Sequence, residues 1–299
     1  MRTSAPVART AAMRIAIRRL DTCGALDALA GIQRSESHNH SEEQVPLSFL
    51  VLILKAGGVA FGAYDEAHEP ALPVGFLLDL AGHRQERRSA YTVSHMVRAD
   101  HRNRGIGYLL RTAERESWLE VGVGWISWGI DPLSGIDAHF AFNKLGALGA
   151  VYERHVLPGS VRVEGHGLAF DRIGVEWSID SPRVRTVVDD GRLPAHYGIG
   201  LDRMEVTTET RAGRDGLRRL VGTASKVQGD VALVEIPVDL GRLLQADLPA
   251  ARTWRIRSRD LLEDLFKNRF LLSGFVHEGG RSFLLLERME RDAALRRVE

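Results

Sequence analysis

The feature that most constrains this chain is a short segment in which a predicted strand runs into two glycines and then directly into a predicted helix. The segment reads Met96-Val97-Arg98-Ala99-Asp100-His101-Arg102-Asn103-Arg104-Gly105-Ile106-Gly107. Glycine accepts positive φ angles and has no Cβ to keep an anion away from backbone N–H groups. The helix that follows adds its N-terminal N–H donors and the positive end of its dipole. The segment therefore predicts a binding site for a pyrophosphate group.

Two familiar phosphate-binding loops do not fit this segment. A P-loop requires Lys followed by Ser or Thr after its second glycine, whereas Tyr108-Leu109 follows Gly107 here. The dinucleotide-binding fingerprint requires a third glycine and opens a βαβ unit near the start of its domain. In this chain several predicted strands come first, so both classes are excluded.

The rest of the chain predicts a mixed order of strands and helices. Apolar periodicity and turn signals indicate strand 13–18, helices from about 21 and at 47–55, strands 59–64, 74–80 and 91–98, helix 107–120, strand 125–130, helix 135–145 and strands 151–156 and 170–179. Residues 181–229 show no clear period and are expected to connect the two parts. After them we expect strand 231–236, helices 239–244 and 250–267, and strands 270–277 and 282–287. The order of this last part repeats that of residues 125–179, which suggests a weak internal repeat.

The motif Arg102-x-x-Gly105-x-Gly107 resembles motif A of the GNAT superfamily of acyl-CoA N-acyltransferases, which runs Arg/Gln-x-x-Gly-x-Gly/Ala after the fourth strand. An accidental glycine turn is the alternative. The resemblance implies an α/β fold in which a mixed, largely antiparallel sheet is flanked by helices. It also implies that loop amides bind the pyrophosphate of coenzyme A and that strand backbone pairs with the pantetheine arm. The cofactor-binding residues implied in this way are Met96, Val97, Arg102, Asn103, Arg104, Gly105, Ile106, Gly107 and Tyr108.

A second segment supports the same resemblance. Residues 137–147 are similar to the superfamily's C-terminal helix, which typically ends Tyr-Glu-Lys-Leu-Gly-Phe. Lys144-Leu145-Gly146 matches that ending, but Phe142 stands where the family's tyrosine often protonates the leaving thiolate. Phenylalanine has no proton to give. The family's usual general acid is therefore missing from its expected position.

Four residues are candidates for the chemistry, since a positioned acid or base contributes about 10²–10⁴-fold. His95, in the strand before the loop, is a candidate base, and a core histidine is the alternative. Asp131, which ends strand 125–130, would anchor or deprotonate an ammonium group, and a simple strand end with a turn is the alternative. Tyr152 and, with less support, His139 would replace the missing acid.

Helix 250–267 raises a separate question about the acceptor. Arg255 and Arg259 lie one helical turn apart, beside Trp254. They are expected either to form a solvated helix face or to bind an acidic acceptor.

Composition excludes several classes of protein and of site. Cys23 is the only cysteine, which excludes an intramolecular disulfide and a thiolate zinc site. Lys+Arg 40 against Asp+Glu 39 leaves a net charge of +1, so no global charge favours nucleic acid or an anionic membrane as a partner. The longest apolar run, residues 47–54, is far shorter than the ~20 residues that span a bilayer. We expect a cytoplasmic protein without a metal.

Taken together, these features predict three regions: a mobile tail at 1–11, a GNAT acyltransferase domain at 12–185, and a C-terminal α+β extension at 186–299 packed on it. The run at 128–133, with 181–184, is also similar to a little-characterised GNAT subgroup with such an extension, which would be an extra segment or a degenerate second GNAT half. The predicted reaction is acetyl transfer from acetyl-CoA to a small-molecule or peptide amine by direct attack. A non-catalytic acyl-CoA-binding or regulatory protein is the alternative, and a homodimer is left open.

Overall fold

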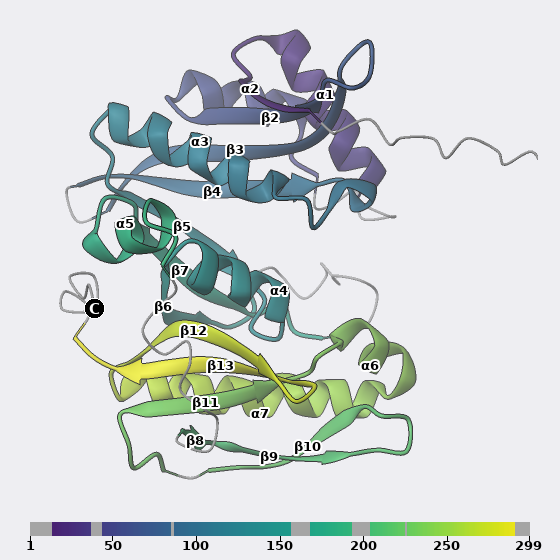
Figure 1. Ribbon diagram of the computed structural model, residues 1–299, viewed down its shortest axis with the longest axis vertical. Helices are drawn as coiled ribbons and strands as arrows, with labels where there is room; N and C mark the ends of the chain where they lie inside the picture. The colour runs from purple at the N-terminus through teal and green to yellow at the C-terminus, as the bar shows by residue number, and fades with distance from the viewer. Residues whose placement is uncertain are drawn as a thin grey trace, which may run out of the picture. The chain divides into compact units, whose positions relative to one another are not determined.

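The computed structural model describes residues 14–36, 44–84, 87–156, 168–192, 204–224 and 226–290. The tail predicted at 1–11 lies outside these ranges. The chain divides into two compact units, one of residues up to 86 with 90–121, and one of residues 87–89 with 122 onwards (Figure 1). The predicted domain division at residue 185 is a different one and stays a prediction.

The first unit is built on a meander of four strands in the order β1-β2-β3-β4. These are β1 Ile15–Arg19, β2 Val59–Asp65, β3 Leu72–Arg84 and β4 Arg87–Val97. The first two pairs are antiparallel, with Ile15 opposite Asp65 and Val59 opposite Asp79. All four strands were expected from the apolar runs, although β3 and β4 extend further than the runs indicate.

Helices cover this meander. They are α1 Cys23–Glu36, α2 Leu47–Lys55, the 3₁₀ turn η2 Ala99–His101 and α3 Ile106–Glu120. Thr22 caps α1, because its Oγ1 accepts a hydrogen bond of 3.3 Å from Ala25 N. Apolar side chains of α1, α2 and the strands then share one buried core, which comprises Leu20, Leu26, Leu29, Ile32, Leu50, Ile53, Ala60, Phe76 and Leu78. Burying each such leucine stabilises the fold by about 2 kcal/mol.

The buried face of α3 is, in contrast, partly polar. Arg111 Nη1 donates to both carboxylate oxygens of Glu114 at 2.9 Å and to Thr92 Oγ1 of β4 at 2.8 Å. Trp118 Nε1 donates to Asp79 Oδ2 of β3 at 2.7 Å. All five side chains are buried. A hydrogen-bonded polar network therefore fixes α3, and with it the loop at its N-terminus, to the sheet.

The second unit contains a larger sheet in the order β5-β7-β6-β12-β13-β11-β8 and a separate β9–β10 hairpin. The strands are β5 Trp125–Ile130, β6 Leu148–Glu153, β7 Arg172–Ser178, β8 Glu205–Val206, β9 Thr208–Ala212, β10 Arg218–Thr223, β11 Val231–Ile236, β12 Phe270–Glu278 and β13 Arg281–Arg288. Among the described strands of this sheet, β8 and β11 alone pair in parallel. The predicted class, a mixed α/β fold with largely antiparallel strands, is confirmed.

The described residues of the second unit form five helical segments: α4 Gly135–Ala138, the π-helix η3 His139–Lys144, α5 Pro182–Val188, α6 Leu240–Ala246 and α7 Leu248–Lys267. The single helix expected at 135–145 is thus a short α-helix followed by a π-helix. Residues 181–229, expected to be a connection, contain α5 and β8 to β10. Within the described ranges, no helix is both long and apolar enough to cross a membrane.

Candidate functional site

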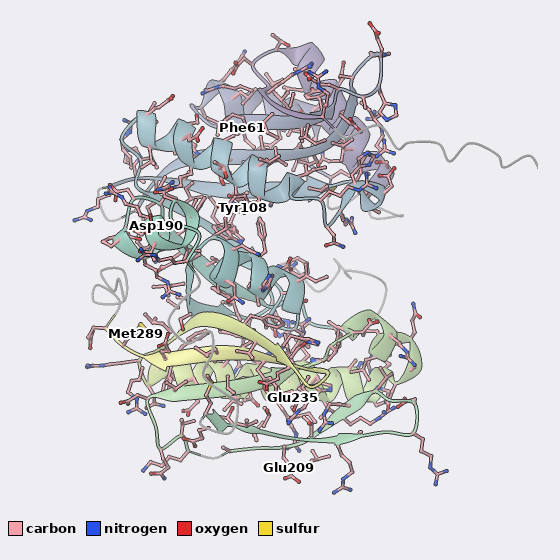
Figure 2. The ribbon with its side chains drawn as sticks, viewed as in Figure 1. Phe61, Tyr108, Asp190, Glu209, Glu235 and Met289 are labelled. Carbon is pink, nitrogen blue, oxygen red and sulfur yellow. The ribbon has the colours of Figure 1, made fainter. Side chains whose placement is uncertain are left out.

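The glycine-containing loop has the backbone conformation that its sequence requires. Asn103 has a φ of 60° and Gly105 a φ of 80°, so both residues are left-handed immediately before α3. Leu109 N makes the first helical hydrogen bond, to Gly105 O at 3.1 Å. The amides that precede it are the N-terminal donors of the helix, next to Tyr108 on its first turn (Figure 2). The loop therefore presents backbone donors at the positive end of a 15-residue helix.

Two glycines make this geometry accessible. A Cβ built on Gly105 would have nothing within 4 Å, so the space beside the loop is open there. A Cβ on Gly75 of β3 would come within 3.0 Å of Met96 O and 3.3 Å of Val97 Cγ2. Gly75 thus lets β3 approach the end of β4 closely. Our sequence reasoning missed Gly75, although a glycine inside an apolar strand run is a recognised signal of close backbone approach.

Arg102 is fixed within the protein by hydrogen bonds. Its Nη2 lies 2.7 Å from Glu36 Oε2, and its Nε donates to Val97 O at 3.0 Å. Glu36 Oε2 also accepts from Ala99 N at 3.1 Å. One lone pair of the Val97 carbonyl is therefore used by Arg102.

In the turn before the loop, the side chains of Arg98 and His101 contact carboxylates. Arg98 donates to Asp100 at 3.0 and 3.2 Å, and His101 Nδ1 lies 2.7 Å from Asp100 Oδ1. The Arg98 hydrogen bond first, and then that of His101, lower the pKa of Asp100 to about 2. His101 Nε2 also lies 3.9 Å from Asp65 Oδ2. The turn is thus tied to β2 as well as to α1.

His95, the candidate base in β4, contacts the loop from within the first unit. Its ring is hydrogen-bonded to the backbone of Gly107, the second glycine of the loop. Burial, followed by the nearby Arg111 charge, lowers its pKa well below the usual value. The imidazole is consequently neutral at physiological pH. This geometry fits a residue that supports the loop, and the proposed catalytic role stays a prediction.

Asp131, in the second unit, follows β5 and is held on both carboxylate oxygens. Oδ1 accepts from Leu133 N at 2.7 Å, and Oδ2 accepts from Arg255 Nη2 of α7 at 2.6 Å. Arg255 is 3% exposed, and within the described residues its Nε and Nη1 have no hydrogen-bond partner. Arg255 therefore does not lie on a solvated helix face, and binding of an acidic acceptor stays a prediction. Its one hydrogen-bond partner among the described residues is Asp131.

Tyr152, on β6, is part of a neighbouring network. Its hydroxyl donates to Asp171 Oδ2 at 2.8 Å, and Arg259 of α7 donates to the same oxygen at 2.8 Å. Burial, and then the Asp171 carboxylate, raise the pKa of Tyr152. A phenol in this arrangement keeps its proton. Tyr152 would have to leave Asp171 to act as an acid, and its proposed role stays a prediction.

The π-helix contains Phe142, His139 and Asn143. Phe142 is fully buried, so a side chain in this orientation would be in the core whatever its chemistry. Asn143 Nδ2 donates to Phe275 O at 2.7 Å and its Oδ1 accepts from Phe275 N at 2.9 Å. Its second N–H faces His139 Nδ1 at 3.1 Å. That nitrogen must accept, so neutral His139 carries its proton on Nε2.

Comparisons with known proteins give structural but not sequence matches. No family model matches the chain, and no curated protein matches it. A probable acetyltransferase from Staphylococcus epidermidis is 17% identical, with a TM-score of 0.45 over 55% of this chain and 99% of that one. A ribosomal-protein-alanine N-acetyltransferase from Escherichia coli is 16% identical, with a TM-score of 0.44 over 56% of this chain and 94% of that one. An acetyltransferase of the GNAT family from Staphylococcus aureus is 16% identical, with a TM-score of 0.40 over 56% and 99%.

These three solved structures are acetyltransferases, the class that the motif resembles. Their TM-scores are below 0.5, so the assignment that follows rests on the chain's own residues.

Proposed function

We propose that this chain is a GNAT-type N-acyltransferase that transfers the acetyl group of acetyl-CoA to an amine. The observation that carries the proposal is the loop at Arg102–Gly107, in which left-handed Asn103 and Gly105 lead directly into α3. Backbone donors and the helix dipole together favour a pyrophosphate, the group that coenzyme A presents. The backbone of Met96 and Val97 would pair with the pantetheine arm.

The reaction is a direct attack in two balanced parts. The amine nitrogen forms a bond to the thioester carbonyl carbon and loses a proton, while the carbon–sulfur bond breaks and the thiolate gains one. A free thiol has a pKa of ~8.5, so the thiolate is a tolerable leaving group near neutral pH. His95 or Asp131 is proposed to assist the amine, and Tyr152 to supply the acid. The acceptor is a small-molecule or peptide amine, and we propose a cytoplasmic location.

A binding experiment with a matched glycine pair tests the loop. Gly105 and Gly122 lie before and after α3, have φ values of 80° and 74°, and would each place a Cβ in open space. Alanine should therefore cost a similar conformational free energy at both, on the order of 1 kcal/mol. Coenzyme A at 100 times its Kd should stabilise the wild type and Gly122→Ala by about 2.7 kcal/mol. The same concentration should stabilise Gly105→Ala much less.

Thermal unfolding with and without coenzyme A measures all three proteins. Equal ligand-induced shifts in the two variants would place the cofactor elsewhere. An absence of any shift in the wild type would overturn the proposed function itself.

A second candidate function is favoured by Phe142. Because this position holds no phenol and is fully buried, the chain could have kept acyl-CoA binding without transfer. Incubation of acetyl-CoA with a panel of amines separates the two functions, since only an enzyme releases free thiol faster than the uncatalysed rate. Binding without thiol release from any amine favours the acyl-CoA-binding protein.

A further inference from the structure

Glu36 is the last residue of α1, and it lies far from the loop in sequence but against it in the fold. Its side chain is only 9% exposed. Oε2 accepts from Arg102 Nη2 at 2.7 Å and from Ala99 N at 3.1 Å, across 66 and 63 residues of sequence. A carboxylate that accepts a backbone N–H and a guanidinium forms strong, charge-assisted hydrogen bonds. Glu36 therefore joins α1 both to the turn before the loop and to the first residue of the motif.

Arg102 completes this connection on the strand side. While Nη2 is bound to Glu36, Nε donates to Val97 O at 3.0 Å. The planar guanidinium thus spans from the end of α1 to the end of β4, and it fixes the direction in which the chain leaves the strand. The loop's left-handed residues, Asn103 and Gly105, follow immediately.

The electrostatics make this arrangement informative. The proposed ligand is an anion, and a nearly buried carboxylate beside its site repels it. Glu36 also neutralises the charge of Arg102, which would otherwise attract phosphate. On charge alone, Glu36 should weaken the binding of the cofactor. Any favourable effect of Glu36 on binding must therefore come from its hydrogen bonds to the loop.

We propose that Glu36 is a positioning residue for the cofactor loop, and that Arg102 acts with it as a brace rather than as a phosphate ligand. The proposal rests on the proposed function, because the loop is taken to bind coenzyme A. The brace holds the turn at Ala99 and the carbonyl of Val97, so the amides after Asn103 are arranged before the ligand arrives. Preorganised donors bind more tightly than donors that must first be ordered.

Whether Glu36→Ala weakens or strengthens the binding of coenzyme A decides between a positioning role and simple charge repulsion. Glu36→Ala removes both hydrogen bonds and one negative charge. The brace predicts that coenzyme A binds at least tenfold more weakly, while repulsion predicts tighter binding. Glu36→Gln removes the charge but keeps an acceptor oxygen, so the brace predicts an affinity between those of Glu36→Ala and the wild type. Titration calorimetry with coenzyme A, at a temperature where every variant is folded, measures these values.

Asp100→Asn is the matched control. It removes one negative charge from the same turn, while the amide oxygen can still accept from Arg98. We expect its affinity for coenzyme A to be unchanged or slightly higher. Hydrogen exchange at the Ala99 amide adds an independent readout, since Glu36→Ala should speed that exchange without any ligand present.

A second variant serves if Glu36→Ala fails to fold. Arg102→Lys keeps the charge on a side chain that is 55% exposed, but it loses the planar fork that reaches both Glu36 and Val97. The brace predicts at least tenfold weaker binding, and a purely electrostatic role predicts no change. Unchanged or tighter binding in Glu36→Ala, or in Arg102→Lys, overturns the inference while leaving the proposed function intact. A wild type that does not bind coenzyme A overturns both.

Discussion

At the scale of single residues, Asp79 and Glu114 bring two carboxyl groups together inside the first unit. Both are fully buried, and they are hydrogen-bonded to each other. Asp79 Oδ1 otherwise has no donor among the described residues. Two carboxylates cannot satisfy each other, so one must hold a proton. Burial first, and then the charge of Glu114, raise the pKa of Asp79 well above its usual value, while Arg111 keeps Glu114 paired.

This arrangement predicts how stability depends on pH. An unfolded aspartate releases its proton near pH ~4, and folded Asp79 does so only at a higher pH. The stabilisation that comes from this raised pKa is present below pH ~4 and is lost as the pH rises through the folded value. Asp79→Asn has no proton to lose, and its amide can accept from Trp118 and donate to Glu114. We expect Asp79→Asn to be more stable than the wild type at pH 8, by on the order of 1 kcal/mol.

Urea unfolding at pH 5 and pH 8 measures this difference, which should shrink at pH 5. Glu114→Gln is the contrasting variant. It leaves the buried Arg111 without its counter-ion and should destabilise the protein by about 3–5 kcal/mol. A lower stability of Asp79→Asn at pH 8 would mean that Asp79 is ionised and needed as an anion.

The sequence predicts some of these residues and not others, for a physical reason. The loop could be found because its whole signal is local: two glycines, an adjacent strand and an adjacent helix. Glu36 could not be found, because its partner Arg102 is 66 residues away and no periodicity encodes that contact. Asp131 was singled out as the end of a strand, but its partner Arg255 lies 124 residues further on. Side-chain pairs that close long loops depend on the tertiary fold.

At the scale of elements, the π-helix at His139–Lys144 replaces the continuous α-helix that the apolar spacing predicts. π-Helices are rare and occur mostly as single turns within α-helices. Here Asn143 binds both backbone groups of Phe275, on β12, as another strand would. This pairing satisfies a buried N–H and a buried C=O at once.

Asn143→Ala tests that explanation. It leaves the N–H and C=O of Phe275 without these partners, so we expect a loss of about 2–4 kcal/mol in the free energy of unfolding. Asn268→Ala is the control, because the exposed side chain of Asn268 has one hydrogen-bond partner among the described residues, Asp264 O at the end of α7. It should cost less than about 1 kcal/mol. Similar losses in both variants, measured by denaturant unfolding, would contradict a structural role for the Asn143 pair.

Two of the strands that the sequence missed share one property. Strands β9 and β10 carry many polar residues, Thr-Glu-Thr-Arg-Ala and Arg-Arg-Leu-Val-Gly-Thr, and among the described strands they pair with each other alone. A strand is recognised in a sequence by the alternation of apolar and polar residues, which requires a row of apolar side chains facing a core. Strands without such a row give no signal of this kind. Strands β11, β12 and β13 were predicted correctly because their apolar runs are almost wholly buried.

At the scale of the whole molecule, residues after 185 complete the second unit. Arg183 Nη2 donates to Ser273 O at 2.7 Å, and the arginines of α7 hold Asp131 and Asp171. A chain that ends at Arg185 would lose these partners and expose the edge of β6 that pairs with β12. We expect it to be insoluble, or to bind a hydrophobic dye strongly. A soluble, monomeric truncated chain with the parent's thermal stability would show that residues 12–185 form an independent domain.

We propose that the loop between β4 and α3 binds the pyrophosphate of coenzyme A. Hydrogen exchange of the full chain, followed by mass spectrometry with and without saturating coenzyme A, tests it most directly. We expect the slowing of exchange to be strongest in the peptides that cover residues 98–110. Slowed exchange confined to other peptides, with this segment unchanged at saturation, would contradict it.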